Sequence, residues 1–323
     1  MTEVKEQQHE ALWVLTGATA VGKTALALAL AEHGDLEIVS MDSMLVYRGM
    51  DVGTAKPTLE ERRGVAHHGM DLVDPAEGYD VTRWLRDAEV ALDDIRSRGK
   101  QALFVGGTGF YLQALVRGIF DGPPTDPVIR AALEERAGLE GSDALHRELL
   151  QLDPPSGGRI HPNDRKRVVR ALEVLQGTGK PLSSWQAEWG WHGHTRPERP
   201  HRVLGLALPS PSLDLRIRQR TTQMLDGGWP EEVTAILADG GFGPSSIQAL
   251  GYREIIHLVQ GRANRPDTEA HIALRTRQFA RKQRTWFKRF PSTLWLEPEL
   301  DGETCSPTKK NLAERALAHF YEA

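Results

Sequence analysis

Eight residues near the start of the chain, Gly17-Ala18-Thr19-Ala20-Val21-Gly22-Lys23-Thr24, have the Gly-x-x-x-x-Gly-Lys-Thr spacing of a phosphate-binding loop. In such a loop, backbone N–H groups and the lysine surround a polyphosphate, and the threonine hydroxyl can reach a Mg²⁺ ion. An apolar run, residues 12–16, precedes the loop, and a run of strong helix formers, residues 24–32, follows it. This is the strand, loop and helix order that the motif requires, so a plain glycine turn before a helix is a weaker interpretation.

A carboxylate, Asp42, follows a second apolar run at residues 36–40. It could help hold a metal ion, act as a general base on an incoming nucleophile, or cap a turn. Phosphate-loop proteins that hydrolyse nucleotides usually place a metal-binding aspartate at the end of a sheet strand. Here the apolar run at residues 102–105 leads into Gly106-Gly107-Thr108 instead, so the bound polyphosphate need not belong to a nucleotide.

The elements that must position these side chains alternate along the chain. Between the apolar runs lies an amphipathic helix at residues 81–98, and Gly99 is placed to end it. Alternating strands and helices favour a parallel α/β sheet, and ligands of such sheets bind at the carboxyl ends of the strands. Asp42 and Thr108 both come just after strand ends, so we expect both to face the phosphate loop.

The pattern changes after residue 126. From there to residue 201 helical stretches dominate and no strand is predicted, and the segment ends in the Trp- and His-rich WGWHGHTRPERPHR. A buried strand is predicted again at residues 203–208, and the chain from Asp214 onward is predicted to be helical. The expected architecture is a catalytic α/β core of residues 1–126 and 202–323 with a helical insertion, residues 127–201.

Two stretches concentrate basic residues. Residues 159–170 contain five Lys or Arg and one Asp, and residues 271–290 contain seven Lys or Arg and no acid. On a helix, Arg277, Arg281, Arg284 and Lys288 form one stripe, which favours a surface for a phosphate backbone over a plain solvated face. The accompanying aromatic stripe, Phe279, Trp286 and Phe290, is predicted to be core packing. Arg216 and Arg220 share a helix face and suit phosphate contacts, although plain surface charge is an equal alternative.

Composition sets broad limits. The chain has 323 residues, is 40% hydrophobic and 26% charged, and carries a formal net charge of −4. Its single cysteine, Cys305, permits neither an intrachain disulfide nor a Cys-based zinc site, and a reducing cytoplasm is expected. The polar N-terminus is no signal peptide and no apolar run approaches a membrane span, so neither a membrane nor an obligate protein partner is predicted.

Six further motifs resemble those of the bacterial tRNA dimethylallyltransferases, or isopentenyl-diphosphate:tRNA transferases. They are DSMLVYRGMDVGTAKP from Asp42, HHGMD from His67, GGTGFY from Gly106, RIHPND from Arg159, GYRE from Gly251 and RQFARKQRTWF from Arg277. The resemblance runs in order from about residue 12 to residue 290. One departure is Ala18, where the family commonly has proline.

The resemblance implies a phosphate-loop, kinase-like core with an inserted helical domain. It implies transfer of a dimethylallyl group from dimethylallyl diphosphate to N6 of the adenosine at tRNA position 37, beside the anticodon. Asp42 would accept the N6 proton and Thr108 would contact the flipped adenosine. Lys23, the loop amides, Thr24 through Mg²⁺, and Arg216 would stabilise the departing diphosphate.

The resemblance also implies a set of residues that contact the tRNA anticodon stem-loop. Besides Asp42 and Thr108 they are Ser43, Met44, Leu45, Arg130, Lys166, Arg167, Val168, Val169, Arg170, Ala249, Leu250, Gly251, Tyr252, Arg253 and Glu254. Two other functions remain open from the residues alone. A small-molecule or nucleotide kinase would explain the loop and the sheet but not the basic stretches. A non-catalytic RNA-binding protein would not need Lys23, Thr24 and Asp42.

Overall fold

A computed structural model of the chain describes residues 11–119, 122–188, 198–298 and 310–321. The chain divides into two compact units, one of Met1–Val116 with Arg199–Ala323 and the other Arg117–Glu198. The second unit contains most of the predicted insertion, residues 127–201, and also includes the residues from Arg117 to 126. Cys305 and most of the Trp- and His-rich segment lie outside the described residues.

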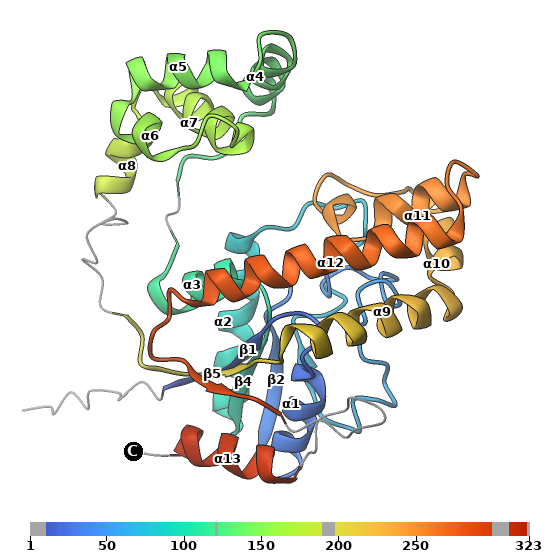
Figure 1. Cartoon of the computed structure of the whole chain (residues 1–323). Helices are drawn as coiled ribbons and strands as arrows, with labels where there is room; N and C mark the ends of the chain where they lie inside the picture. The colour runs from blue at the N-terminus through green and yellow to red at the C-terminus, as the bar shows by residue number, and fades with distance from the viewer. Residues whose placement is uncertain (1–10, 120–121, 189–197, 299–309, 322–323) are drawn as a thin grey trace, which may run out of the picture. The chain divides into compact units, whose positions relative to one another are not determined.

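A six-stranded, wholly parallel sheet forms the centre of the first unit (Figure 1). Its strand order is β3-β2-β4-β1-β5-β6. The strands are β1 (Leu12–Gly17), β2 (Leu36–Ser40), β3 (His67–His68), β4 (Gln101–Gly106), β5 (His201–Leu206) and β6 (Leu294–Leu296). The predicted parallel α/β core is therefore confirmed, and the apolar runs that predicted strands form β1, β2, β4 and β5.

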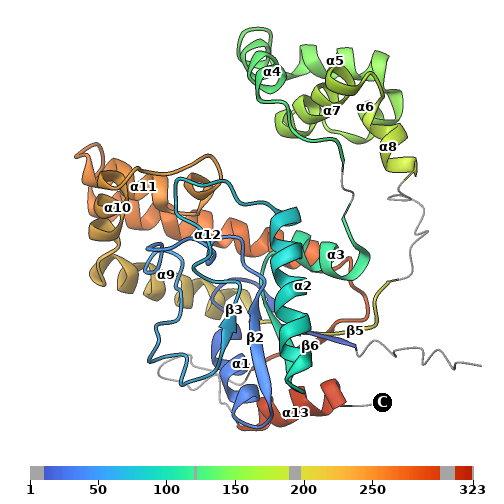
Figure 2. The same ribbon diagram turned by 180° about the vertical axis from the view of Figure 1, so that it is seen from behind.

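Alternate residues of each central strand enter different cores, because successive side chains point to opposite faces of a sheet. Leu12 and Val14 of β1 pack in one apolar cluster, and Trp13 and Leu15 pack in another. The first cluster includes α2 (Val81–Ser97) and α3 (Gly109–Arg117), and the second includes α1 (Lys23–Ala31) and α13 (Lys310–Tyr321) (Figure 2). Helices on both faces explain why these strands are continuously apolar.

The remaining helices of the first unit follow β5. They are α9 (Ser210–Asp226), α10 (Trp229–Ala238), α11 (Tyr252–Val259) and α12 (Arg265–Phe287). Helix α12 passes over the carboxyl ends of the strands and packs beside α9 (Figure 1). The prediction that everything after Asp214 is helical was wrong at β6, a three-residue strand whose pairing with β5 supplies hydrogen bonds that local sequence does not indicate.

The second unit is entirely helical within its described residues. It contains α4 (Pro127–Leu139), α5 (Ser142–Leu152), α6 (Pro154–Arg159), α7 (Arg165–Thr178) and α8 (Leu182–Glu188). Asp164 caps α7 by accepting from the Arg167 N–H, and the helix ends at Gly179, which has a φ of 71°. The unit has its own apolar core, which includes Val168, Val169 and Leu172.

Candidate functional site

The phosphate loop joins β1 to α1, and its shape depends on glycine at two positions. Gly17 and Gly22 have φ of 142° and 101°, a region that side chains disfavour. A Cβ on Gly17 would also lie 2.5 Å from the Leu206 carbonyl oxygen of β5. The loop therefore lies tightly against the sheet, and Lys23 reaches back over it, donating to the Gly17 and Ala18 carbonyls at 3.1 and 2.9 Å.

Two arginines of α9 hold the same loop. Arg216 Nε donates to the Ala20 carbonyl at 2.8 Å, and Arg220 Nη2 donates to the Thr19 hydroxyl at 2.6 Å. Burial lowers the pKa of the Lys23 amine to about 8, opposed by Asp42 and reinforced by Arg220. Burial likewise lowers the pKa of the Arg220 guanidinium to about 10. Three cations thus surround the loop, which creates a strong site for an anion.

Asp42 and Thr108 lie together because they follow neighbouring strands, β2 and β4. Asp42 Oδ1 accepts from the Met44 N–H at 2.9 Å, and Thr108 Oγ1 accepts from the Ser43 N–H at 3.3 Å. Asp42 therefore does cap a turn, as one interpretation of the sequence held. Within the described residues this involves only one carboxylate oxygen, so capping does not exhaust the hydrogen-bonding capacity of Asp42.

Two cavities meet at this point. The first, of about 610 Å³, is lined by Lys23, Thr24 and Arg216 and by apolar side chains that include Leu45 and Ile38. The second, of about 310 Å³, is lined by polar and apolar groups that include Ser43, Met44, Thr108, Ala249 and Leu250. Asp42, Thr19, Thr54 and Arg220 line both cavities. A group bound in one cavity can therefore meet a group bound in the other beside Asp42.

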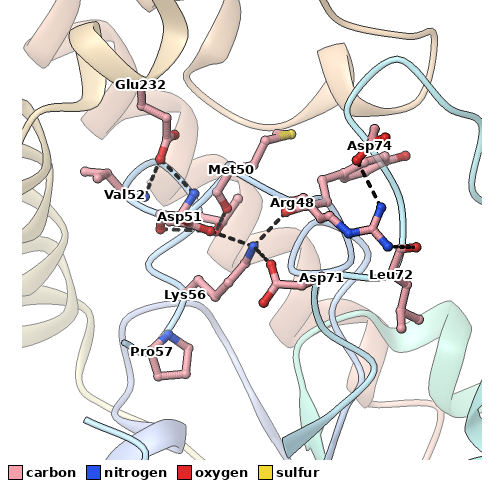
Figure 3. Close-up of polar contacts among 12 residues, drawn as sticks. Arg48, Met50, Asp51, Val52, Lys56, Pro57, Asp71, Leu72, Asp74 and Glu232 are labelled. Carbon is pink, nitrogen blue, oxygen red and sulfur yellow. Dashed lines mark hydrogen bonds and ion pairs between the residues drawn. The ribbon is translucent and has the colours of Figure 1, made fainter. Parts of the chain in front are cut away.

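The loop that follows Asp42 is held by a buried lysine (Figure 3). The Lys56 side chain, 3% exposed, contacts Asp51 Oδ1 at 2.7 Å, Asp71 Oδ1 at 2.5 Å and the Tyr47 carbonyl at 2.6 Å. Glu232 of α10 accepts from the Asp51 and Val52 N–H groups at 2.7 and 2.6 Å. These contacts give physical roles to the charged residues of the DSMLVYRGMDVGTAKP motif, because a buried charge is stable only with such partners.

Helix α12 carries basic residues on two sides. One side, which we call the cavity flank, consists of Arg275, Phe279 and Lys282 and lines the second cavity. The other side, the α9 flank, is the predicted stripe Arg277, Arg281, Arg284 and Lys288. In it Arg277 pairs with Asp214 at 3.5 Å and Arg284 donates to Ser210 at 3.2 Å, both on α9.

Phe279 corrects one prediction. It was assigned to the core with Trp286 and Phe290, but it is 43% exposed and borders the second cavity. Phe290 is buried, and Trp286 packs against the core. A periodic aromatic pattern identifies a helix face but not which part of that face the neighbouring elements cover, so the sequence could not separate Phe279 from the other two.

Three of the expected tRNA contacts have buried side chains. Val168 and Val169 lie in the core of the helical unit, and Tyr252 is fully buried, with its hydroxyl donating to Glu232 at 2.7 Å. Their side chains are therefore packing residues. Gly251 and Ala249 are also buried, whereas Arg253, Lys166 and Arg167 are exposed.

Three other expected tRNA contacts already form ion pairs within the protein. Arg130 and Arg170 both pair with Glu173, which is 1% exposed, at 2.7 and 3.1 Å. Glu254 pairs with Arg275 of the cavity flank. These ion pairs do not prevent RNA contact, but they give each residue a structural role that its position in a motif did not indicate.

Sequence reasoning missed two polar residues that shape the site. Arg220 was seen only as one member of a basic helix face, yet it lines both cavities. Gln283 of α12 accepts from the Thr19 N–H at 2.8 Å and donates to the Gly107 carbonyl at 2.9 Å. Gln283 could have been noticed in the sequence because it is a neutral amide among the basic residues of the RQFARKQRTWF motif.

The chemistry of Thr24 suits a Mg²⁺ ion shared with a phosphate ligand. Its side chain lies in the first turn of α1 and lines the first cavity with Lys23 and Asp42. Magnesium is commonly held by one or two protein oxygens together with substrate phosphates and water. Among the described residues, no group of three or more His, Cys, Asp or Glu side chains gathers as a self-contained metal site.

A parallel sheet with a phosphate loop at its carboxyl edge, and a carboxylate between two adjoining cavities, defines a group-transfer protein of the phosphate-loop class. The sequence model of the family described as "IPP transferase" matches residues 45–290, and that of "Isopentenyl transferase" matches residues 10–71. The chain belongs to the IPP transferase family.

Similarity to individual proteins covers nearly the whole chain. A "tRNA dimethylallyltransferase" of Deinococcus radiodurans is 43% identical over 313 residues, 96% of each chain. One of Geobacter metallireducens is 42% identical over 299 residues, 91% of this chain and 94% of its own. The solved structure of the tRNA isopentenylpyrophosphate transferase of Bacillus halodurans matches 96% of this chain and 97% of its own, with 32% identity and a TM-score of 0.67.

Proposed function

We propose that this protein transfers the dimethylallyl group of dimethylallyl diphosphate to N6 of the adenosine at tRNA position 37. The observation that carries the proposal is the junction of the two cavities at Asp42. One cavity has the cationic phosphate loop and an apolar wall, which together suit a diphosphate with a short hydrocarbon group. The other has the polar and apolar lining and the adjacent basic helix that suit an extruded nucleobase of an RNA loop.

In the proposed reaction the N6 amine attacks the allylic carbon that carries the diphosphate. A C–N bond forms, the C–O bond breaks, and its electron pair leaves with the diphosphate. Asp42 accepts the proton that N6 loses. An exocyclic amine is a weak nucleophile, so placement and a nearby base are both needed. The hydrogen bond from the Ser43 N–H to Thr108 holds Asp42, the proposed general base, beside the threonine that would contact the adenosine.

The leaving diphosphate requires neutralisation. Lys23, Arg216 and Arg220 supply positive charge, and the loop amides of residues 20–24 supply hydrogen-bond donors. Thr24 would hold Mg²⁺, which would add positive charge at the phosphate oxygens when bound. Because these groups come from the phosphate loop, α1 and α9, which pack together in the protein, the charge distribution is set before substrate arrives, and little reorganisation is needed during transfer.

Recognition of tRNA would depend on backbone contacts by exposed basic residues. Lys166 and Arg167 of the helical unit and the two flanks of α12 carry the exposed charge. The net charge of −4 does not oppose this, because RNA responds to the local distribution of charge rather than to its sum. The relatives named as tRNA-modifying enzymes, similar over nearly the whole chain, support the same substrate.

The test is mass spectrometry of an anticodon stem-loop RNA incubated with the protein, Mg²⁺ and dimethylallyl diphosphate. We expect one dimethylallyl group on the adenosine 3′ of the anticodon. Asp42→Asn keeps the Oδ1 atom that caps Met44 and should slow transfer about 10²–10⁴-fold, the range for loss of a general base.

Asp35→Asn, at the opposite end of β2, is the matched control and should leave transfer unchanged. An unmodified RNA together with hydrolysis of ATP would overturn the proposal in favour of a kinase. Near-normal transfer by Asp42→Asn would instead reduce Asp42 to a turn cap.

A further inference from the structure

One buried amide joins the two halves of the site. Gln283 is 7% exposed, and its side chain lies between the phosphate loop and the turn that carries Thr108. Its oxygen accepts from the Thr19 N–H at 2.8 Å and its nitrogen donates to the Gly107 carbonyl at 2.9 Å. Only this orientation of the amide pairs a donor with an acceptor on both sides, so the hydrogen bonds themselves fix it.

The space for this side chain exists because position 107 is glycine. A Cβ there would lie 2.3 Å from Gln283 Nε2, and one on Gly109 would lie 2.2 Å from the Trp286 ring. The GGTGFY and RQFARKQRTWF motifs, far apart in the sequence, are therefore in direct contact. Gly107 and Gly109 allow α12 to approach the end of β4, and this close approach lets Gln283 form its hydrogen bonds to both segments.

This link has a consequence for the phosphate loop. The Thr19 N–H donates to Gln283 and is therefore already hydrogen-bonded within the protein. The Thr19 hydroxyl accepts from Arg220. Thr19 also lines both cavities. Its position is thus fixed by two hydrogen bonds, and the Gln283 amide relates it to Gly107, the residue before Thr108.

We propose that Gln283 is a positioning residue for the transfer reaction, which sets the separation between the diphosphate loop and the Thr108 turn without contacting either substrate. The inference rests on the proposed function. A misplacement of about 1 Å between reacting groups can cost about 10²-fold in rate. Loss of the link should therefore slow the chemical step while each substrate continues to bind.

The test compares Gln283→Met with wild type in three measurements. These are the single-turnover transfer rate with saturating dimethylallyl diphosphate, the KM for stem-loop RNA, and calorimetric affinity for inorganic pyrophosphate with Mg²⁺. We expect the rate to fall about 10- to 100-fold, with KM and pyrophosphate affinity within about threefold of wild type. Pyrophosphate affinity should hold because Met frees the Thr19 N–H rather than removing a donor from the loop.

Gln260→Met is the matched control, since Gln260 is an exposed amide at the end of α11 that lines neither cavity. It should keep the wild-type rate. Where Gln283→Met does not fold, Gln283→Leu replaces it under the same criteria, because Leu also removes both hydrogen bonds without adding a charge beside the loop. Wild-type transfer is measured alongside, so a failure of the proposed function appears there and not in the variants.

Two results would overturn the inference. One is a transfer rate per pyrophosphate-binding site within twofold of wild type. The other is a parallel fall of rate and pyrophosphate affinity by the same factor, which would make Gln283 a structural support of the loop.

Discussion

Arg220 offers the sharpest test of how the site stabilises its leaving group. Its guanidinium is enclosed at the junction of both cavities, donates to Thr19 at 2.6 Å, and lies close enough to Lys23 to lower its pKa. Arg220→Met keeps most of the side-chain length and removes the charge and the donors. We expect it to lose stabilisation of the negative charge that develops on the diphosphate.

The size of the effect follows from electrostatics in a partly enclosed site. Two unit charges about 4 Å apart interact by about 4 kcal/mol at an effective dielectric constant near 20. Water and a bound cation would screen part of this, so we expect a loss of about 2–4 kcal/mol, comparable to removing one oxyanion-hole donor. That corresponds to a decrease of about 30- to 1000-fold in kcat/KM for dimethylallyl diphosphate.

The assay is steady-state transfer to a stem-loop RNA, with thermal unfolding of each variant as a control for folding. Arg218→Met, an exposed arginine on the same helix, should behave as wild type. Thr19→Val removes the hydroxyl that Arg220 contacts but keeps the charge, and should cost less than tenfold. A kcat/KM within threefold of wild type for Arg220→Met would refute the reasoning and leave Arg220 as a support of the loop.

Three further predictions follow from the charges of the first unit. Burial lowers the pKa of Lys23 to about 8, so kcat/KM for dimethylallyl diphosphate should fall as pH rises through 8, because the free enzyme loses this cation. Lys23→Arg should shift this fall to higher pH. A pH profile of kcat/KM that is flat from pH 7 to 9.5 would contradict the assignment. Reversing Arg281 and Lys288 to Glu should raise the KM for RNA and flatten the salt dependence of RNA binding. Reversing Arg275 and Lys282 of the cavity flank should have a larger effect on both quantities. If both double variants keep the wild-type salt dependence, RNA binds on a surface other than α12. Glu37 is buried in β2 and hydrogen-bonded by Arg98, which lowers its pKa far below the ordinary value. Its stabilisation is fully present above the unfolded-state pKa and decreases below it until the folded-state pKa is passed. Glu37→Gln should therefore unfold about 1–3 kcal/mol more easily at pH 7, and denaturant titrations should show this difference narrowing as pH falls from about 5 to about 3; a difference that does not change with pH would contradict the assignment.

The sequence was informative wherever a signal is local. The phosphate loop could be predicted because the spacing of Gly17, Gly22, Lys23 and Thr24 is itself the structure that binds phosphate. Strands β1, β2, β4 and β5 could be predicted because strands buried on both faces are continuous apolar runs. The approach of Asp42 to Thr108 followed from topology, since parallel strands bring their carboxyl ends to one edge.

Contacts between distant segments could not be predicted in the same way. Strand β6 is three residues long and exists through its pairing with β5, and Tyr252 looks like a motif residue but packs in the core. Gln283 lies 264 positions from Thr19 and 176 from Gly107 along the chain. No pattern of spacing relates residues so far apart.

The sequence by itself thus determined the chemistry available to this protein, namely a cationic phosphate loop, a carboxylate and basic helices on an α/β core. Only the tertiary structure decided which of those groups share a cavity. Residue types and short spacings set local backbone shape and charge, whereas α12 crossing the carboxyl edge of the sheet brings Phe279 to the second cavity and Gln283 to the loop. That crossing is fixed by the packing of whole helices and by the glycines that allow it, and packing depends on all the partners at once.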